Sequence, residues 1–355
     1  MTQAQNGWQR GGWTLGLALL MVLGVCLSAE GQRWKEKTPA QWSDILQKSL
    51  EKENRPAIRE QWYAVYALGE YAAQKDAEQT DAIVEILLKR LAVDQGQDDY
   101  VRAAIATTLG KIGDAQAIPA LTEALTSDYT AIRRCAADAL NHFGQKASVP
   151  ATRDALKKVL KEDSDATTRS NAAVTLWNTT SDAAALEYLE KLLDSKKSLE
   201  KYQAATAIGR LEGLSDKVSA KLGKGLIPLL ALTGIQDQDT ARAGVAALVQ
   251  LGKPTLAEVR KAFRTAKNDL AKSRYLTVLA NIDISATTSD ELLQLAKAKE
   301  TPMVVRIAAI RGLRNVVPEK RDAAKALVLV WTKDTDAPRN IVFEATQILK
   351  TLEAE

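Results

Sequence analysis

The stretch Leu109-Gly110-Lys111-Ile112-Gly113 lies in the first copy of a unit that occurs twice in succession. The first copy begins at Tyr100-Val101-Arg102, and the second begins at Ala131-Ile132-Arg133. An interval of 31 positions separates three matching pairs: Arg102 and Arg133, Gly113 and Gly144, and Pro119 and Pro150. A fixed period of this size is typical of stacked repeat proteins, so it indicates the fold before any single motif does.

The position of Arg102 can be followed through the rest of the chain at intervals of 31 to 41 residues. Its equivalents are Gln61, Arg102, Arg133, Arg169, Lys201, Ala241, Lys272, Arg306 and Arg339. Seven residues after each of them comes an aliphatic residue, except in the last copy, where it is Thr346. Residues seven apart share one face of a helix, so each position is expected to begin the second helix of a pair. The sequence therefore predicts an all-α fold over residues 30–355, an α-α superhelix with about nine helix pairs.

The composition agrees with a helical solenoid and argues against a nucleic-acid-binding protein. Aromatic residues make up 5% of the 355 residues, and the 48 basic side chains nearly balance the 44 acidic ones, for a net charge of +4. A nucleic-acid-binding domain usually has a clear basic excess clustered on one face. A nucleic-acid-binding solenoid is therefore the third interpretation of function, and it requires a continuous basic groove.

Residues 1–29 have the pattern of an export signal. Arg10 precedes an apolar run from Trp13 to Leu27, and the segment contains no acidic residue and ends at the small residue Ala29. The run is shorter than the ~20 residues of a transmembrane helix and fits the apolar part of a signal peptide. Cleavage after Ala29 would place the mature protein in the periplasm or outside the cell. The alternatives are an uncleaved membrane anchor and a lipoprotein signal in which Cys26 is lipidated.

Aromatic residues are concentrated at the start of the predicted solenoid, between about residues 34 and 71. They are Trp34, Trp42, Trp62, Tyr63, Tyr66 and Tyr71. Thr38-Pro39 is a typical helix start, with a capping residue followed by proline in the first turn. A terminal repeat lacks one neighbour and must cover its exposed edge, so we interpret the aromatic segment as an N-terminal cap. The alternative is an aromatic platform for a ligand.

The start at Tyr100-Val101-Arg102, the alanine-rich middle, the stretch 109–113 and Ile118-Pro119-Ala120-Leu121 define the unit. Together they resemble bacterial HEAT repeats of the phycobilisome-lyase type, over roughly residues 38–352. The resemblance implies a HEAT-like solenoid. It implies little about function, because this repeat occurs in lyases, hydroxylases, glycosylases and plain scaffolds.

Basic residues dominate the repeated position, and acidic residues precede most of them by two to six positions. Its arginines are Arg102, Arg133, Arg169, Arg306 and Arg339. In HEAT-like repeats such pairs are similar to an Asp–Arg ladder that connects neighbouring repeats, and a partly buried ladder favours the rigid fork of arginine. We therefore interpret these arginines as structural rather than as a row of phosphate-binding groups.

Counting excludes most catalytic centres. The chain has one histidine, His142, and the di-iron hydroxylases that share this repeat use paired His-Glu motifs. The two cysteines, Cys26 and Cys135, do not complete a zinc site. Cys135 lies among alanines and is most simply a small core residue. We expect no catalytic residue, no metal and no cofactor.

Nine residues after the repeated position lies a row of mostly polar side chains. The candidates for partner binding in this row are His142, Asn178, Arg210, Gln250, Asn281 and Asn315. If the second helices line an inner surface, the row would form a polar stripe suited to a peptide backbone or a glycan, since amides both donate and accept hydrogen bonds. The alternative is that the row marks helix ends, where asparagine is a common terminator.

Two intervals of the repeat are longer than the others. The extra residues fall at Asp94–Asp99 and at Glu212–Gly225, and the glycines of the second segment suggest a loop or an extra turn. Insertions in solenoids usually map to loops on one edge.

The sequence thus predicts an exported, non-catalytic scaffold that binds a protein, a peptide or a glycan. The leading alternative is a lyase-like or other accessory module whose chemistry lies in a partner. No nucleic acid is expected as a partner, and contact with a membrane is expected only if the signal segment stays uncleaved.

Overall fold

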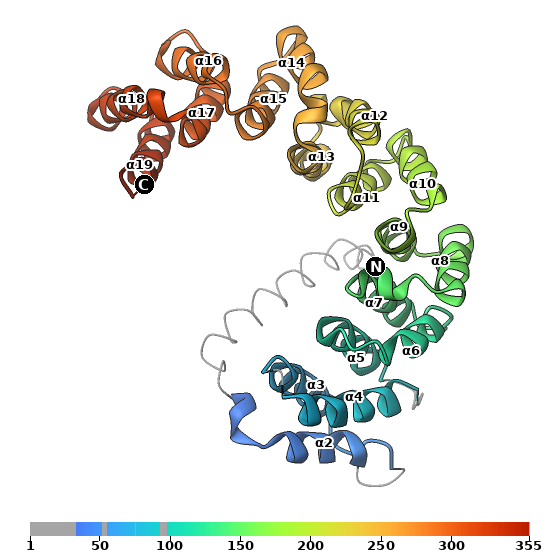
Figure 1. The fold of residues 1–355 in the computed structure, drawn as a ribbon. Coiled ribbons are helices and arrows are strands. Elements are labelled where there is room, and N and C mark those ends of the chain that lie inside the picture. The colour runs from blue at the N-terminus through green and yellow to red at the C-terminus, as the bar shows by residue number, and fades with distance from the viewer. Residues whose placement is uncertain (1–32, 52–54, 75, 93–97, 355) are drawn as a thin grey trace, which may run out of the picture. The chain divides into compact units, whose positions relative to one another are not determined.

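The computed structural model describes residues 33–51, 55–74, 76–92 and 98–354, and within them it contains helices and no strand (Figure 1). The predicted all-α class is confirmed. The predicted signal segment, with its cleavage position Ala29, lies outside the described residues. In the described ranges, no helix is both long enough and apolar enough to cross a membrane.

The chain divides into two compact units, the first ending at Ala147 and the second beginning at Ser148. The first unit contains the 3-10 helices η1 (Arg33–Glu36) and η2 (Gly144–Ala147). Its α-helices are α2 (Pro39–Lys48), α3 (Ile58–Ala72), α4 (Ala77–Ala92), α5 (Asp99–Ile112), α6 (Ala117–Ala124) and α7 (Thr130–Asn141).

The second unit continues the pattern with twelve α-helices. They are α8 (Pro150–Glu162), α9 (Ala166–Thr180), α10 (Ala183–Leu193), α11 (Ser198–Ile208), α12 (Asp216–Leu226), α13 (Gln238–Leu251), α14 (Leu256–Thr265), α15 (Asp269–Ile282), α16 (Ala286–Lys297), α17 (Met303–Gly312), α18 (Arg321–Lys333) and α19 (Arg339–Ala354). Short 3-10 helices connect some of them: η3 (Ile227–Ala231), η4 (Ile235–Asp237), η5 (Lys253–Thr255), η6 (Leu313–Asn315) and η7 (Pro318–Lys320).

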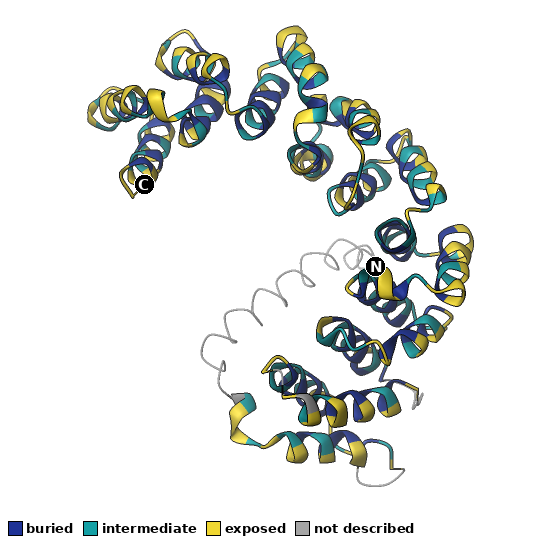
Figure 2. Ribbon diagram, viewed as in Figure 1, coloured by how far each residue is buried: buried dark blue, intermediate teal, exposed yellow. Residues whose placement is uncertain are grey.

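In both units each even-numbered helix packs against the odd-numbered helix that follows it. Successive odd-numbered helices also pack on one another, from α3 to α7 in the first unit and from α9 to α19 in the second. The described residues therefore contain nine helix pairs, as the period predicts. Figure 2 shows buried residues on the sides of the helices that face neighbours in the same unit.

The apolar residues predicted to face the core do so. Leu68, Leu109, Leu140, Leu176, Ile208, Leu248, Leu279 and Leu313 all have 0% exposure. The repeated position itself is the fourth residue of its helix from α3 to α17, so the prediction that it begins the second helix is confirmed.

The frame predicted for the last copy is wrong by three residues. Arg339 is the first residue of α19, and the fourth is Val342. The buried positions of this helix are Ile341, Ala345, Ile348 and Leu352. Thr346 is therefore no exception to the apolar rule, because it does not lie at the equivalent position.

The two glycines of the stretch 109–113 have different structural roles. A Cβ atom on Gly110 would lie 2.7 Å from the Cα of Ala139, so the absence of a side chain lets α5 and α7 approach closely. Gly113 ends α5 in the left-handed region, with φ of 72°, and its N–H donates to the carbonyl of Leu109. Glycine adopts that conformation without a steric cost, which explains its place at the end of the helix.

The insertion at Glu212–Gly225 is a helix rather than the expected loop or turn. Most of it forms α12, which Ser215 caps by accepting a hydrogen bond from the N–H of Val218. A Cβ on Gly223 would come within 2.6 Å of Thr255, and one on Gly225 within 2.8 Å of Leu193. The glycines are thus contact positions between helices. The irregular part comes later, in η3 and η4.

Candidate functional site

Four arginines of the predicted ladder donate hydrogen bonds to backbone carbonyls near the end of the preceding helix. Arg102 Nε bonds to Leu91 O at 3.0 Å, and Arg133 Nη1 bonds to Ser127 O at 2.9 Å and to Asp128 O at 3.1 Å. Leu91 is in the last turn of α4, where carbonyls have no partner within the helix, whereas Ser127 and Asp128 lie in the segment between α6 and α7. Each bond joins the two helices of one pair.

Arg169 and Arg306 make the same kind of contact in the second unit. Arg169 Nη1 donates to the carbonyl of Asp163. Arg306 is buried, and its Nη2 donates to Lys299 O and, at 2.8 Å, to Thr301 O. Its guanidinium also lies over the ring of Trp331, 5.4 Å from the centroid. Arg339, in contrast, is exposed and belongs to a different helical position.

Two of the stripe asparagines connect neighbouring repeats of the second unit. Asn178 Nδ2 donates to Arg210 O at 3.1 Å, and its Oδ1 accepts from the N–H of Glu212 at 2.9 Å. Asn315 Nδ2 donates to Ala280 O at 2.9 Å and to Asn281 Oδ1 at 3.3 Å. These amides are half-buried, and their hydrogen bonds are made within the chain.

The other stripe residues divide into two groups. Arg210 and Asn281 are half-buried; Arg210 Nη1 donates to Asn171 Oδ1 at 3.0 Å, and Asn281 Nδ2 donates to Thr277 O at 2.7 Å. His142, in the first unit, and Gln250, in the second, are exposed. The open part of the predicted stripe in the second unit is therefore smaller than its sequence suggests.

A buried polar cluster in the first unit has no counterpart in the sequence predictions. Arg90 Nη2 lies 2.5 Å from Asp98 Oδ2 and 3.1 Å from Gln61 Oε1. Its Nε donates to Ser49 Oγ at 2.8 Å. The cluster joins the end of α2, the beginnings of α3 and α5, and the last turn of α4. The sequence gives no signal for this cluster, because Arg90 falls outside the repeated position.

The aromatic segment lies at the N-terminal end of the first unit, in η1, α2 and α3. Thr38 forms a capping box with Gln41 at the start of α2. The Trp42 indole is 5% exposed and donates to Trp34 O at 2.8 Å, while Tyr71 donates its hydroxyl to Lys37 O at 2.9 Å. These bonds hold η1 and the segment after it against α2 and α3.

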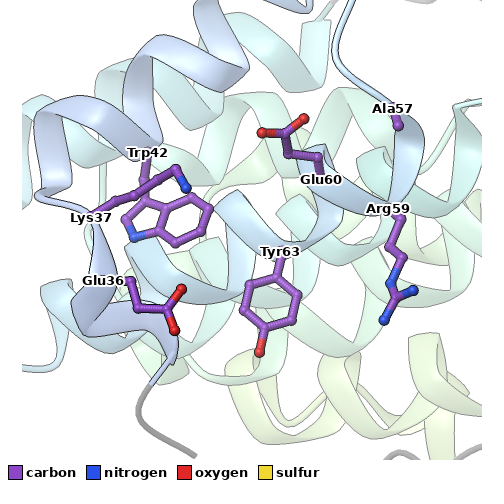
Figure 3. A pocket seen from close by; sticks show the side chains of 7 residues that line it. All are labelled: Glu36, Lys37, Trp42, Ala57, Arg59, Glu60 and Tyr63. Atoms are coloured by element: carbon purple, nitrogen blue, oxygen red, sulfur yellow. The ribbon is translucent and has the colours of Figure 1, made fainter. Parts of the chain in front are cut away.

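The same end of the first unit also contains a hollow of about 480 Å³, which we call the end hollow. It is lined by Glu36, Lys37, Trp42, Ala57, Arg59, Glu60 and Tyr63. Figure 3 shows the Tyr63 ring at its centre, with the charged side chains around it and Trp42 to one side. The ring centroids of Trp42 and Tyr63 are 6.1 Å apart. The aromatic segment therefore borders an open site, and its role as a cap of the repeat stack stays a prediction.

In the second unit, large apolar side chains are exposed where successive odd-numbered helices begin. Leu199, Leu270 and Val304 are the second residues of α11, α15 and α17, and Ile235 is the first residue of η4, which directly precedes α13. Their exposed fractions are 55%, 37%, 42% and 86%. They follow one another at intervals of 36, 35 and 34 residues. We call Leu199, Ile235, Leu270 and Val304 the apolar edge row.

The four helices of the apolar edge row pack side by side in chain order. Each is separated from the next by one even-numbered helix that returns the chain, so the odd-numbered helices run in the same direction and begin at the same edge. Contiguous exposed apolar surface on a soluble protein often marks an interaction site, and here one exposed apolar side chain recurs at each of four neighbouring repeats. Within the described ranges, no group of three or more His, Cys, Asp and Glu side chains could hold a metal ion.

The sequence profile of the HEAT repeats family matches residues 84–177. No curated protein matches the chain. Among solved structures, the chain is similar to the Kap95:Nup1 complex, with 14% identity and a TM-score of 0.53 over 89% of this chain and 45% of that one. It is also similar to the karyopherin Kap121p bound to the extreme C-terminus of the protein phosphatase Cdc14p, with 12% identity and a TM-score of 0.51. That match covers 94% of this chain and 39% of the karyopherin.

These identities are low, so the two matches establish a likeness of fold. A third match is human deoxyhypusine hydroxylase in complex with glycerol, with 15% identity over 89% of this chain and 97% of that one. Its TM-score is 0.33. The fold is thus a stack of HEAT-like helix pairs. A fold of this kind serves many functions, so the surfaces of this chain are the evidence for its own.

Proposed function

We propose that the protein is a non-catalytic scaffold that binds another protein through the apolar edge row and works in the cell envelope or outside the cell. The apolar edge row is the observation that carries the binding role. It presents one large apolar side chain per repeat on four successive repeats of the second unit. Helical repeats commonly use such extended surfaces to hold a partner along their length.

The chemistry of the row favours a partner with an extended apolar segment. Packed helices lie about 8–10 Å apart, so neighbouring members of the row are separated by about that distance. A polyproline II segment rises about 3.1 Å per residue and has three residues per turn, so every third side chain would return to the row. The two similar solved structures with TM-scores above 0.5 are complexes with another protein, which agrees with this use of the fold.

Export is the second part of the proposal, and it rests on the pattern of residues 1–29. It predicts a mature chain that begins near Glu30 and is recovered from the envelope or the medium. N-terminal sequencing of the native protein tests this directly. A chain that begins at Met1 or Thr2 would contradict cleavage.

Site-specific photo-crosslinking in cells that produce the protein tests the binding role. A photoreactive amino acid at Leu270 should form adducts with another protein, whereas the same group at the exposed Lys217 of α12 should not. The adduct should disappear when Leu199→Ser and Val304→Ser are introduced together. Equal adducts at both positions, or an adduct that survives the two substitutions, would refute the assignment of the apolar edge row.

A further inference from the structure

The end hollow of the first unit has properties that a cap alone does not require. Trp42 of α2 is almost fully buried, and its ring lies 6.1 Å from that of Tyr63 on α3. Beyond it, Tyr63 stays half-buried, and four charged side chains surround the remaining space. The volume of about 480 Å³ falls in the range of small-molecule sites. We propose that the end hollow binds a neutral saccharide.

The wall of the hollow is fixed before any ligand arrives. The hydrogen bonds from Trp42 to Trp34 O and from Tyr71 to Lys37 O hold the segment that carries Glu36 and Lys37. The Tyr63 ring is packed against Trp42, Trp62 and Tyr66, with centroid distances of 6.1, 6.3 and 6.1 Å. A preformed wall reduces the loss of side-chain freedom on binding, which favours affinity for a small ligand.

The charges of the hollow are balanced. Two acidic side chains, Glu36 and Glu60, and two basic ones, Lys37 and Arg59, line it. Figure 3 shows these side chains arranged around the Tyr63 ring. A ligand with a single net charge would therefore meet as many like charges as opposite ones. This balance argues against a phosphate or a simple cation and favours a ligand without net charge.

Hydroxyl groups match the hydrogen-bonding capacity of these side chains. Carboxylates only accept hydrogen bonds, and ammonium and guanidinium groups only donate them, whereas a hydroxyl does both. A polyhydroxylated ligand can therefore satisfy Glu60 and Arg59 at the same time through charge-assisted bonds. The C–H face of a sugar ring supplies an apolar surface for the aromatic face of Tyr63. A saccharide combines both features in one small molecule.

The test titrates the full-length purified protein with cellohexaose, maltohexaose and chitohexaose, and follows tryptophan fluorescence and heat of binding. At least one of the three should give a saturable response. Tyr63→Ala and Glu60→Gln should each weaken it at least about tenfold, since each removes a direct contact. Glu78→Gln, an exposed substitution on α4 outside the hollow, should leave it unchanged. Thermal melting of each variant shows whether the first unit remains folded. Arg59→Gln changes a second, exposed residue of the hollow, so it should weaken binding without changing the melting temperature.

Three outcomes would overturn the proposal. One is the absence of a response to all three saccharides. Another is binding that survives Tyr63→Ala, Glu60→Gln and Arg59→Gln, because the ligand would then lie elsewhere. The third is saturable binding of triglycine or inorganic phosphate that competes with the saccharide or replaces it, because the hollow would then select a charged or zwitterionic ligand.

Discussion

Arg90 and Asp98 form an ion pair that is almost completely removed from solvent, with side-chain exposures of 0% and 7%. The distance from Nη2 to Oδ2 is 2.5 Å. Arg90 also binds Ser49 and Gln61, so that residues from the first two helix pairs meet at one guanidinium. The stability of a fold with charges buried this deeply depends on both partners being present, because an unpaired buried charge raises the free energy of the folded state.

Arg90→Met should therefore lower the stability of the first unit by ~3–5 kcal/mol, since it leaves the Asp98 carboxylate buried without its main partner. Hydrogen exchange read by mass spectrometry over residues 33–147 measures the effect locally. Arg59→Met, an exposed substitution on α3, is the matched control and should change little. Unchanged exchange in the Arg90 variant would show that the cluster does not stabilise the unit.

Gly110→Ala and Gly113→Ala should both destabilise the first unit, for different reasons. The Cβ of the first would collide with the backbone of Ala139, so α5 and α7 must separate. The second has open space but a φ of 72°, and a residue with a Cβ loses ~1–2 kcal/mol there. Denaturant titration should show the larger loss for Gly110→Ala. The Cβ of Ala139 also lies within 2.7 Å of that position, so Ala139→Gly should restore part of the stability of the Gly110 variant, with the contact to the Cα left in place, and none of the stability of the Gly113 variant.

The repeats could be predicted from the sequence because their signal is local and periodic. Leu109 and Leu140 mark one helix face in each copy, and every copy repeats the same requirement for burial. The last copy was misplaced because Arg339 imitates the repeated arginine three residues too early. The partners of Arg90 could not be predicted, because Arg90 itself lies outside the repeated position and Ser49 and Gln61 lie 41 and 29 residues away in the sequence.

The candidate surfaces were only partly visible in the sequence. The aromatic segment could be recognised from its composition, but the hollow beside Tyr63 depends on how η1 folds back against α3. The members of the apolar edge row could not be separated from core residues, since leucine and valine near a helix start give the same pattern in either case. The polar stripe could be recognised in the sequence as a row of polar side chains. The hydrogen bonds that Asn178 and Asn315 make to neighbouring repeats could be identified only in the structure.

Arg306→Ala should destabilise the second unit, whereas Arg339→Ala should not. Arg306 is buried, donates to the carbonyls of Lys299 and Thr301, and lies over the Trp331 ring. Its loss should lower stability by ~2–4 kcal/mol, because the buried carbonyl of Thr301 is left without its donor. Arg339 is exposed, and its substitution should stay within ~0.5 kcal/mol. Arg306→Lys should restore only part of the stability, because an ammonium cannot reproduce the fork of arginine. Equal effects of the two alanine substitutions would contradict the assignment.

The carboxyl of Asp283 should make the stability of the second unit sensitive to acid. Burial pushes its pKa upward, but hydrogen bonds from Thr288, Ser285 and Arg260 outweigh burial and lower the pKa below its usual value. The unfolded chain then takes up the proton at a higher pH than the folded one. The stabilisation is present above the unfolded pKa of about 3.9 and is lost as the pH falls through the folded pKa.

Asp283→Asn should therefore flatten the dependence of stability on pH below about pH 5. Denaturant titrations at pH 6, 5, 4 and 3 measure this slope for the variant and the native chain. Asp322→Asn, an exposed substitution on α18, serves as the control and should keep the native slope. A native chain that loses no more stability in acid than the Asp283 variant would rule out this carboxyl as a source of the effect.

The last prediction separates structural amides from binding amides in the polar stripe. Asn178→Ala removes the hydrogen-bond partner of Arg210 O and of the Glu212 N–H. It should therefore lower the free energy of unfolding by ~1–3 kcal/mol. Asn315→Ala should act similarly through Ala280 O. Gln250 is exposed, so Gln250→Ala should leave the melting temperature unchanged and, if the stripe contacts a partner, should weaken binding by itself.

The four substitutions at Asn178, Gln250, Asn281 and Asn315 should accordingly lower stability when they are combined. Affinity for an identified partner must be measured at a temperature where circular dichroism shows the combined variant still folded. Lost binding under that condition, with weak dependence on salt, would mean that the stripe holds its partner through amide hydrogen bonds rather than charge. Binding that persists until the variant unfolds would mean that these amides serve to connect one repeat to the next.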